Sequence, residues 1–129
     1  MKDIKILLVE DNLLNQQLTA NILNREGYIA DLAVNGKEGV DLFMKNKYEI
    51  VLMDIQMPVM DGIQATKLIR EYERTTGCNK SKIIAVTAHA QEEEKENLFN
   101  AGMDLYLSKP FRADELLSMI KSEKEQLQF

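Results

Sequence analysis

Residues 50–58 read Ile-Val-Leu-Met-Asp-Ile-Gln-Met-Pro, and this stretch decides the fold. Four consecutive apolar residues lead into a lone aspartate, Asp54, and a proline follows four positions later. A short apolar run of this kind is typical of a strand that is buried on both faces, as in a parallel sheet covered by helices. Because ligands bind such sheets at the carboxyl ends of the strands, we expect Asp54 to lie at the functional edge of the molecule.

Short apolar runs alternate with helical patterns along the rest of the chain. The expected strands are residues 4–9, 28–33, 50–54, 83–86 and 105–107. This alternation is typical of an α/β fold with a parallel sheet. We therefore predict a single doubly wound (βα)5 domain, residues 1–129 with a core of about 4–122. The flavodoxin-like strand order 2-1-3-4-5 is adopted from known five-stranded sheets of this class, because the residues alone do not determine it.

Two of the expected helices, the first and the third, have a recognisable inward face. In the first, Leu14, Leu18 and Ile22 recur at helical spacing and are expected to face the core, with Gly27 beyond the last turn. The third helix begins at the Asp61-Gly62 turn. The residues of this helix that are expected to face inward are Ala65, Leu68, Ile69 and Tyr72.

Composition and charge limit the classes of function. Of the 129 residues, 45% are hydrophobic and 29% are charged, which suits one globular domain with a core of its own. The formal net charge of −5 argues against direct binding to nucleic acid, which needs a cationic face. The single cysteine excludes a disulfide framework, and the single histidine excludes a histidine-rich metal site. With no apolar run long enough for a bilayer and no signal peptide, we expect a cytoplasmic domain that does not contact membranes.

Four of the five expected strands end in side chains that can take part in chemistry. They are the Glu10–Asp11 pair, Asp54, Thr87 and Lys109. The remaining strand end offers only Asn35, which together with Glu38 resembles the capping box of a helix. In the order 2-1-3-4-5 the first and third strands are neighbours, so Glu10, Asp11 and Asp54 should converge.

These side chains suit a phosphoryl group and a divalent cation. Three carboxylates and one ammonium sum to −2, and carboxylates this close raise one another's pKa unless a cation compensates. Mg²⁺ prefers oxygen ligands, so two carboxylates and a carbonyl suit it, and Mn²⁺ is the alternative ion. With the cation bound, Asp54 can attack phosphorus in line. Lys109 and the Thr87 hydroxyl can then stabilise the charge on the phosphoryl oxygens.

Each of these residues also has an ordinary structural explanation. The Glu10–Asp11 pair can supply negative charge to the start of a helix. Asp54 can be a turn residue before Pro58. Thr87 alone is uninformative, and an isolated lysine such as Lys109 is most often a solvated surface residue. It is the joint arrangement at four strand ends that favours the phosphoryl site.

At these residues the chain resembles the receiver domain of two-component response regulators. The resemblance covers Ile6 to about Ile120. Its motifs are the acidic pair at 10–11, Asp54 with Met57-Pro58 and Asp61-Gly62 after it, Thr87-Ala88, and Lys109-Pro110-Phe111. The segments 54–62 and 87–90 also resemble the receivers of hybrid sensor kinases. Whether the chain is a stand-alone regulator or the receiver of a larger kinase is left open by the sequence.

The resemblance implies a phosphoacceptor and a metal site. Asp54 would receive the phosphoryl group from a histidine kinase or a histidine phosphotransfer domain. Asp11, Asp54 and the backbone carbonyl of Gln56 would hold Mg²⁺ directly, and Glu10 would act through a water molecule.

The resemblance also implies a switch around the phosphoryl group. The residues expected to stabilise that group, or to rearrange with it, are Thr87, Ala88, Lys109 and Tyr106. Gln56 and His89 would flank the pocket at its rim and set the lifetime of the phosphate. The Lys109–Pro110 peptide bond is expected to be cis. The output surface would be the face built from the fourth helix, the fifth strand and the fifth helix, presented to a partner or an attached domain that the sequence does not identify.

Two other classes of protein share parts of this pattern. Phosphatases of the haloacid-dehalogenase type also use an aspartate nucleophile with Mg²⁺, but they resemble one another in a general acid two positions later, where this chain has Gln56. Flavodoxin-like electron carriers need a phosphate loop that the Glu10–Asp11 pair would repel. We therefore predict a signalling switch rather than an enzyme, one that assists its own phosphorylation and dephosphorylation.

Overall fold

Five strands alternate with five helices in the part of the chain that the structure, a computed structural model, describes: residues 4–57, 59–88 and 92–127. In chain order the elements are β1 (Lys5–Val9), α1 (Leu13–Arg25), β2 (Ile29–Ala33), α2 (Gly36–Lys45), β3 (Ile50–Asp54), α3 (Gly62–Thr76), β4 (Lys82–Thr87), α4 (Glu92–Ala101), β5 (Leu105–Ser108) and α5 (Ala113–Leu127). Each strand begins and ends within one residue of its expected bounds.

The five strands form one parallel sheet. Their order is β2-β1-β3-β4-β5, so the predicted order 2-1-3-4-5 is confirmed. All five residues of β3 are buried, as the apolar run in the sequence predicts. The parallel direction brings the carboxyl ends of all five strands to one edge of the sheet, and Asp54 is the last residue of its central strand.

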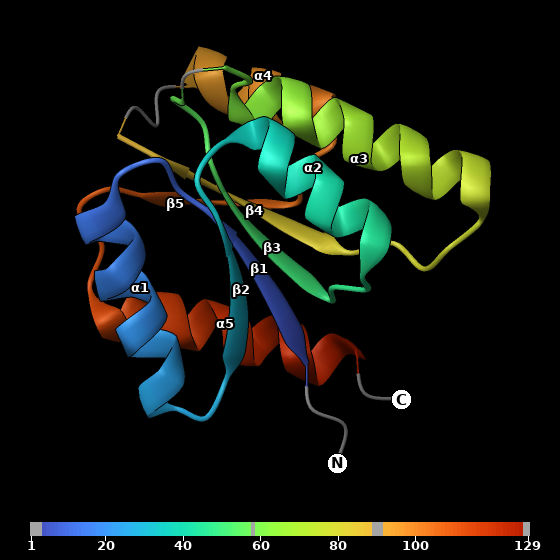
Figure 1. The fold of residues 1–129 in the computed structure, drawn as a ribbon. Coiled ribbons are helices and arrows are strands. Elements are labelled where there is room, and N and C mark those ends of the chain that lie inside the picture. The colour runs from blue at the N-terminus through green and yellow to red at the C-terminus, as the bar shows by residue number, and fades with distance from the viewer. Residues whose placement is uncertain (1–3, 58, 89–91, 128–129) are drawn as a thin grey trace.

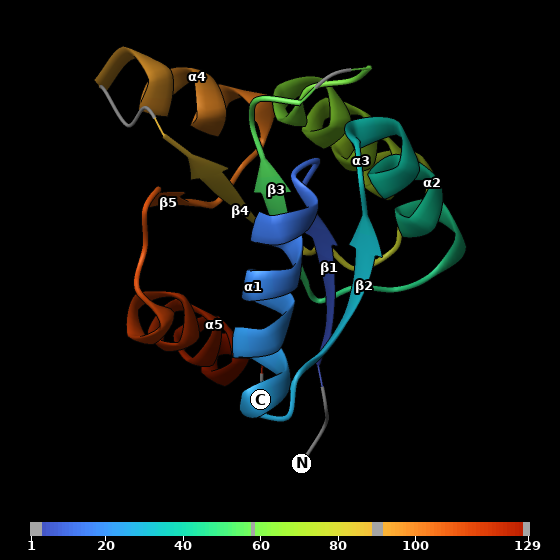
Figure 2. The same ribbon diagram turned by 60° about the vertical axis from the view of Figure 1, so that its left-hand side comes forward.

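Helices cover both faces of the sheet. Figure 1 and Figure 2 show α1 and α5 on one face and α2, α3 and α4 on the other. Each face has its own core of buried side chains, one centred on Leu7, Val51 and Ile83 and the other on Ile6, Leu52 and Ile84. Alternate side chains along each strand therefore pack into opposite cores. None of the described helices combines the length and the apolar character that crossing a membrane requires.

Side-chain caps start the helices that follow the first three strands. Asn12, Asn35 and Asp61 each accept a hydrogen bond from the backbone N–H three residues further on. Such a cap contributes about 1 kcal/mol and determines where the helix begins. In α2, which begins after the Asn35 cap, Val40 and Phe43 are buried. The caps thus fix the loops that leave the strands at the functional edge.

The prediction for the inward face of α1 is wrong for Leu14 and Leu18. Leu14 and Leu18 are 67% and 54% exposed. The buried residues of α1 are Gln16, Thr19 and Leu23. Gln16 and Leu14 are two positions apart and therefore about 200° apart around the helix axis. Leu14 and Leu18 therefore face outward, whereas Ile22, the third residue of the expected face, is partly buried against the core.

Gln16 explains this orientation of α1. Its side-chain Nε2 donates to the backbone carbonyl of Glu10 at 3.3 Å and to that of Ala33 at 3.0 Å. These carbonyls lie where β1 and β2 end, and the Ala33 carbonyl also accepts the backbone N–H of Glu10 at 3.0 Å. The polar contact therefore places the Gln16 side of the helix against the sheet.

The inward face of α3 is also partly different from the prediction. Ala65 and Ile69 are fully buried and Tyr72 is partly buried, as expected, but Leu68 is 39% exposed. Glu73, near the end of the helix, is buried although it is charged. A buried carboxylate needs partners, and here they are Arg70 on the same helix and Ser81 just before β4.

Arg70 on α3 is the centre of a partly buried ionic network. Its Nη1 lies 2.7 Å from Oε1 of Glu73, and its Nη2 lies 2.6 Å from Oδ2 of Asp104. The same guanidinium donates to the backbone carbonyls of Gly102 and Ser81. The other carboxylate oxygen of Glu73 accepts the Ser81 N–H at 2.8 Å. This network joins α3 to the start of β4 and to the loop between α4 and β5.

Arg70→Ala is expected to lower the free energy of unfolding by about 3 kcal/mol, because it leaves two carboxylates without their cation. Urea denaturation followed by circular dichroism measures the change. The matched control is Arg74→Ala on the same helix, where both Arg74 and its partner Glu71 are exposed. That pair is expected to contribute about 0.5 kcal/mol or less. Equal losses in the two variants would contradict the role assigned to the network.

Candidate functional site

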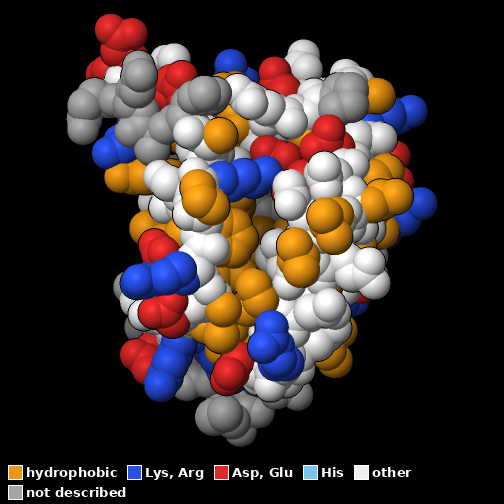
Figure 3. Space-filling view, turned by 90° about the vertical axis from the view of Figure 1, so that its left-hand side faces the viewer, with side chains coloured by type: hydrophobic (Ala, Val, Ile, Leu, Met, Phe, Trp, Pro, Cys, Tyr) orange, Lys and Arg blue, Asp and Glu red, His pale blue; other side chains and the backbone are white. Residues whose placement is uncertain are grey.

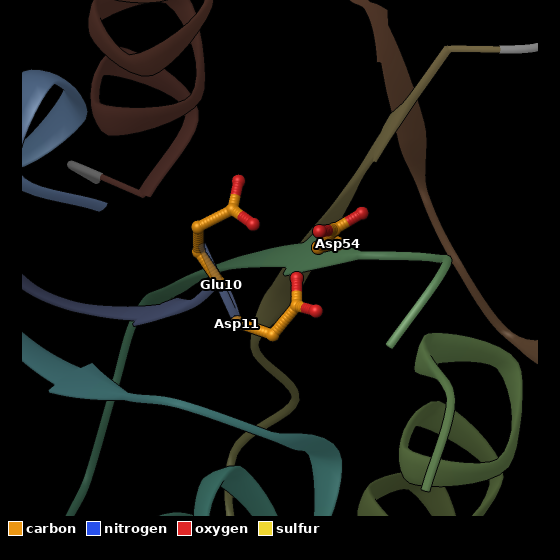
Figure 4. A group of neighbouring side chains, drawn as sticks. All are labelled: Glu10, Asp11 and Asp54. Carbon is orange, nitrogen blue, oxygen red and sulfur yellow. The ribbon is translucent and has the colours of Figure 1, made fainter. Parts of the chain in front are cut away.

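Three carboxylates converge at the carboxyl edge of the sheet. Glu10 and Asp11 directly follow β1, and Asp54 ends β3, which pairs with β1. Each residue contributes one carboxylate oxygen to a group of three oxygens that lie within 4.8 Å of one another. Glu10 and Asp54 are buried, and Asp11 is half-buried (Figure 4). The three side chains therefore lie close together in the structure, as predicted.

Lys109 reaches this cluster from the loop after β5. Its Nζ lies 3.0 Å from Oε1 of Glu10 and 3.5 Å from Oδ2 of Asp54. Its backbone N–H donates to the carbonyl of Thr87 at 2.8 Å, which ties the loop to the end of β4. The peptide bond between Lys109 and Pro110 is cis. Residues from both halves of the chain thus meet at Asp54.

The site carries more negative charge than its one ammonium can balance. Burial raises the pKa of Asp54 to about 7, and the hydrogen bond and the negative charge of Glu10 act in the same direction. Burial also opposes ionisation of Glu10, but its hydrogen bonds to Asp54 and Lys109 hold its pKa below the usual value. The two carboxyl groups therefore compete for one proton, which is the behaviour of like charges held close together.

The backbone around Asp54 is held by close packing. A Cβ on Gly62, the first residue of α3, would overlap the carbonyl oxygen of Asp54. Only glycine allows α3 to begin this close to β3. The Gly62 N–H donates to the carbonyl of Ile55, and Asp61 caps the helix. The Asp61-Gly62 motif therefore serves to fix the loop that carries the aspartate.

Three more of the predicted site residues lie around the acids: Thr87, Ala88 and Gln56. Thr87 is buried at the end of β4, where its neighbour Val86 pairs with Asp54. Ala88 lines the same cavity as Asp54. Gln56 is exposed, and its backbone N–H donates to Oδ1 of Asp54 at 3.3 Å. His89 lies outside the described residues.

Tyr106 lies apart from the acids, beside α4. It pairs with Ala85 of β4, and its ring is half-buried against the core under α2, α3 and α4. The ring of Phe99 meets it edge-on, with 6.5 Å between the ring centroids. Tyr106 therefore connects the end of the sheet to the fourth helix.

A cavity of about 620 Å³ leads from the acids along the face between α1 and α5. Its lining includes Asp54 and Lys109 at the polar end and Leu18, Ile22 and Phe111 along the apolar part. Figure 3 shows this hollow with hydrophobic side chains on its floor. The exposed Leu18 of α1 thus borders an opening that leads to Asp54.

Two residues that support the site were not among the predicted site residues. The Asn12 N–H donates to Oε2 of Glu10 at 3.2 Å, and its side chain caps α1. An Asn that precedes a helix is a signal in the sequence, and it could have been read as a cap. Gln16, which holds the backbone after β1 in place, has no local signal because its partners belong to other strands.

Comparison with known proteins places the chain in a family. The family model described as "Response regulator receiver domain" matches residues 6–121. Hybrid signal transduction histidine kinase I of Dictyostelium discoideum is 39% identical over 92% of this chain, which spans only 7% of that kinase. Two-component response regulator 24 of Arabidopsis thaliana is 41% identical, over 88% of this chain and 79% of the relative.

Solved structures of receiver domains have the same fold. The receiver domain of sensor histidine kinase PA1611 from Pseudomonas aeruginosa, with a magnesium ion coordinated in its active-site cleft, is 38% identical. It has a TM-score of 0.83, with 94% of this chain and 97% of that chain covered. The Ssk1 receiver domain of Saccharomyces cerevisiae, in complex with the histidine phosphotransfer protein Ypd1, is 32% identical, with a TM-score of 0.86 and coverages of 95% and 88%. This chain belongs to the response regulator receiver domain family.

Proposed function

We propose that this receiver domain accepts a phosphoryl group on Asp54 from a phosphohistidine donor, with Mg²⁺ bound beside it. The observation that carries the proposal is the position of Asp54, a buried carboxylate between two acids and an ammonium at the edge of the sheet. The test is the mass of the intact protein after reaction with acetyl phosphate. We expect one added phosphoryl group in the presence of Mg²⁺ and none after chelation.

The donor atoms of the site fit Mg²⁺. Glu10, Asp11 and Asp54 offer only oxygen ligands, which this ion prefers. Burial is the main cause of the raised pKa of Asp54, and the negative charge of Glu10 adds to it; a divalent cation would offset that charge. Asp11, Asp54 and the backbone carbonyl of Gln56 would hold the ion, Glu10 would act through water, and Mn²⁺ is the alternative. When bound, the ion supplies positive charge that lets a phosphoryl group approach the acids.

The side chains around Asp54 have separate roles in the transfer. A carboxylate oxygen of Asp54 forms the new bond to phosphorus as the bond from phosphorus to the donor's imidazole nitrogen breaks, and its electron pair returns to that nitrogen. Lys109, the Thr87 hydroxyl and the Ala88 backbone would stabilise the transferred oxygens. We expect the domain to assist both its phosphorylation and its dephosphorylation, with Gln56 and His89 at the rim setting the phosphate lifetime.

A signalling switch explains the site better than a phosphatase. The matches are to receiver domains, hybrid histidine kinases and response regulators, and none of them supports the haloacid-dehalogenase alternative. Gln56 stands where that class needs a general acid, and an amide cannot transfer a proton in that role.

The cavity between α1 and α5 supports a histidine kinase or phosphotransfer domain as the donor. Its apolar lining extends from Leu18 and Phe111 up to Asp54, so a partner packed there can present a phosphohistidine to the carboxylate. The exposed Leu14 enlarges this apolar surface. The complex of the similar Ssk1 receiver with Ypd1 supports a donor of this kind.

Leu18→Gln is expected to slow transfer from phosphorylated Ypd1, used as a surrogate donor, by about tenfold, because a central apolar contact of a docking surface is lost. Reaction with acetyl phosphate should be unchanged, since a small donor needs no docking surface. The matched control is Leu68→Gln, which replaces an exposed leucine on the opposite face of the sheet. Equal slowing in both variants, or slowing with acetyl phosphate as well, would contradict the assignment of this surface.

A further inference from the structure

The fourth helix carries one cation among several acids. Residues 92–101 read Glu-Glu-Glu-Lys-Glu-Asn-Leu-Phe-Asn-Ala. Glu93, Glu94 and Glu96 are exposed, whereas Lys95 is half-buried. Lys95 is therefore less exposed to solvent than these three acids.

The partner of Lys95 on the sheet is the ring of Tyr106. The Lys95 Nζ lies 4.6 Å from the ring centroid, which is within the range of a cation–π interaction. Phe99, one helical turn further along α4, meets the same ring edge-on. One face of α4 thus contacts Tyr106 with both a charge and an aromatic ring, while the core lies on the other side of the ring.

The opposite end of α4 is fixed to the rest of the molecule. Leu98, Ala101 and Met103 are buried, and the carbonyl of Gly102 accepts a hydrogen bond from Nε of Arg70 at 2.8 Å. The end of α4 after Phe99 is therefore anchored in the core. The contact of Lys95 with Tyr106 lies in the first turn of the helix, away from this anchor.

We propose that Lys95 is a positioning residue that holds Tyr106 in the orientation seen here and so sets how readily the domain switches. The inference rests on the proposed function and on the switch that the family resemblance implies, in which Thr87 moves toward the phosphoryl group and Tyr106 turns into the space that it leaves. Turning the ring away from α4 gives up the contact with the ammonium. The switched conformation becomes easier to reach when that contact is absent.

The test is the affinity for beryllofluoride, a phosphoryl mimic, in the presence of Mg²⁺. A lost cation–π contact of this kind is expected to favour the switched conformation by about two- to fivefold. The apparent dissociation constant of Lys95→Gln should fall by the same factor, because the ligand binds the switched state. In the absence of ligand, its amide resonances along β5 and α4 should move from the wild-type positions toward the beryllofluoride-bound positions.

Three further variants separate this role from a general effect of charge. Lys95→Arg should behave as wild type, because a guanidinium also stacks on an aromatic ring. Lys121→Gln removes an exposed lysine from α5 and should change nothing. In a Tyr106→Leu background, Lys95→Gln should have no effect, since the ring is gone.

The outcomes distinguish the inference from the function on which it rests. Wild-type affinity in Lys95→Gln overturns the positioning role, and so does an equal change in Lys95→Arg or Lys121→Gln. An effect of Lys95→Gln that persists without the Tyr106 ring overturns it as well. If the wild-type domain does not bind beryllofluoride with Mg²⁺ at all, the proposed phosphoacceptor function fails instead.

Discussion

Asp54→Asn is expected to abolish phosphorylation by acetyl phosphate and by a phosphohistidine donor. An amide oxygen is a far weaker nucleophile than a carboxylate, and the variant offers no other carboxylate at the end of β3. Intact-mass spectra recorded with Mg²⁺ should show one phosphoryl adduct on the wild-type protein and none on the variant. The expected effect is therefore a complete loss of the adduct.

A matched control keeps the fold and the other charges of the site. Asp61→Asn replaces the exposed cap of α3, where asparagine caps as well as aspartate. This variant should carry the same adduct as the wild-type protein. An equal adduct on Asp54→Asn would refute the phosphoacceptor assignment and point to Glu10 or Asp11. Peptide mapping of the labelled protein would then identify which of these carboxylates reacts.

Thr87→Ala is expected to separate phosphorylation from switching. The Thr87 hydroxyl lies at the end of β4, next to the residue that pairs with Asp54. A phosphoryl group adds charge and strong hydrogen-bond acceptors there, so the hydroxyl would move inward to donate to it. The variant should still accept the phosphoryl group, because Lys109 and the metal remain. The movement that makes room for Tyr106 should be lost.

Amide chemical shifts with and without beryllofluoride measure this coupling. In the wild-type protein we expect changes both at the acids and along β5 and α4. In Thr87→Ala the changes at the acids should remain, and those around Tyr106 should largely disappear. Thr87→Ser keeps the hydroxyl and should behave as wild type. Wild-type shift changes around Tyr106 in Thr87→Ala would show that the coupling runs through other residues.

Much of the fold and of the acidic cluster could be predicted from local patterns. The apolar run before Asp54 indicates a strand with two buried faces, and that is a property of neighbouring residues alone. Parallel strands share one edge at their carboxyl ends, so residues that follow them must gather there. The convergence of Glu10, Asp11 and Asp54 follows once the strand order is adopted from known folds.

The tertiary structure alone decided which side of α1 meets the sheet. Periodicity marks Leu14 and Leu18 as one stripe of the helix, but it does not say what that stripe will contact. The stripe faces outward because the buried Gln16 donates to two carbonyls at the ends of β1 and β2. The outward leucines contribute to the surface that we propose for the phosphodonor, because Leu18 lines the cavity that leads to Asp54.

The contacts between distant residues were likewise decided by the tertiary structure. Lys109 meets Glu10 across 99 positions of the chain, and Arg70 meets Asp104 across 34. Lys95 faces Tyr106 although it lies within a run of glutamates that the sequence marks only as an acidic helix. Local patterns determine which residues form a helix or strand, because they depend on neighbours in the chain. The partner of a buried charge depends on which elements pack together, and that is determined only when the whole sheet and its helices have assembled.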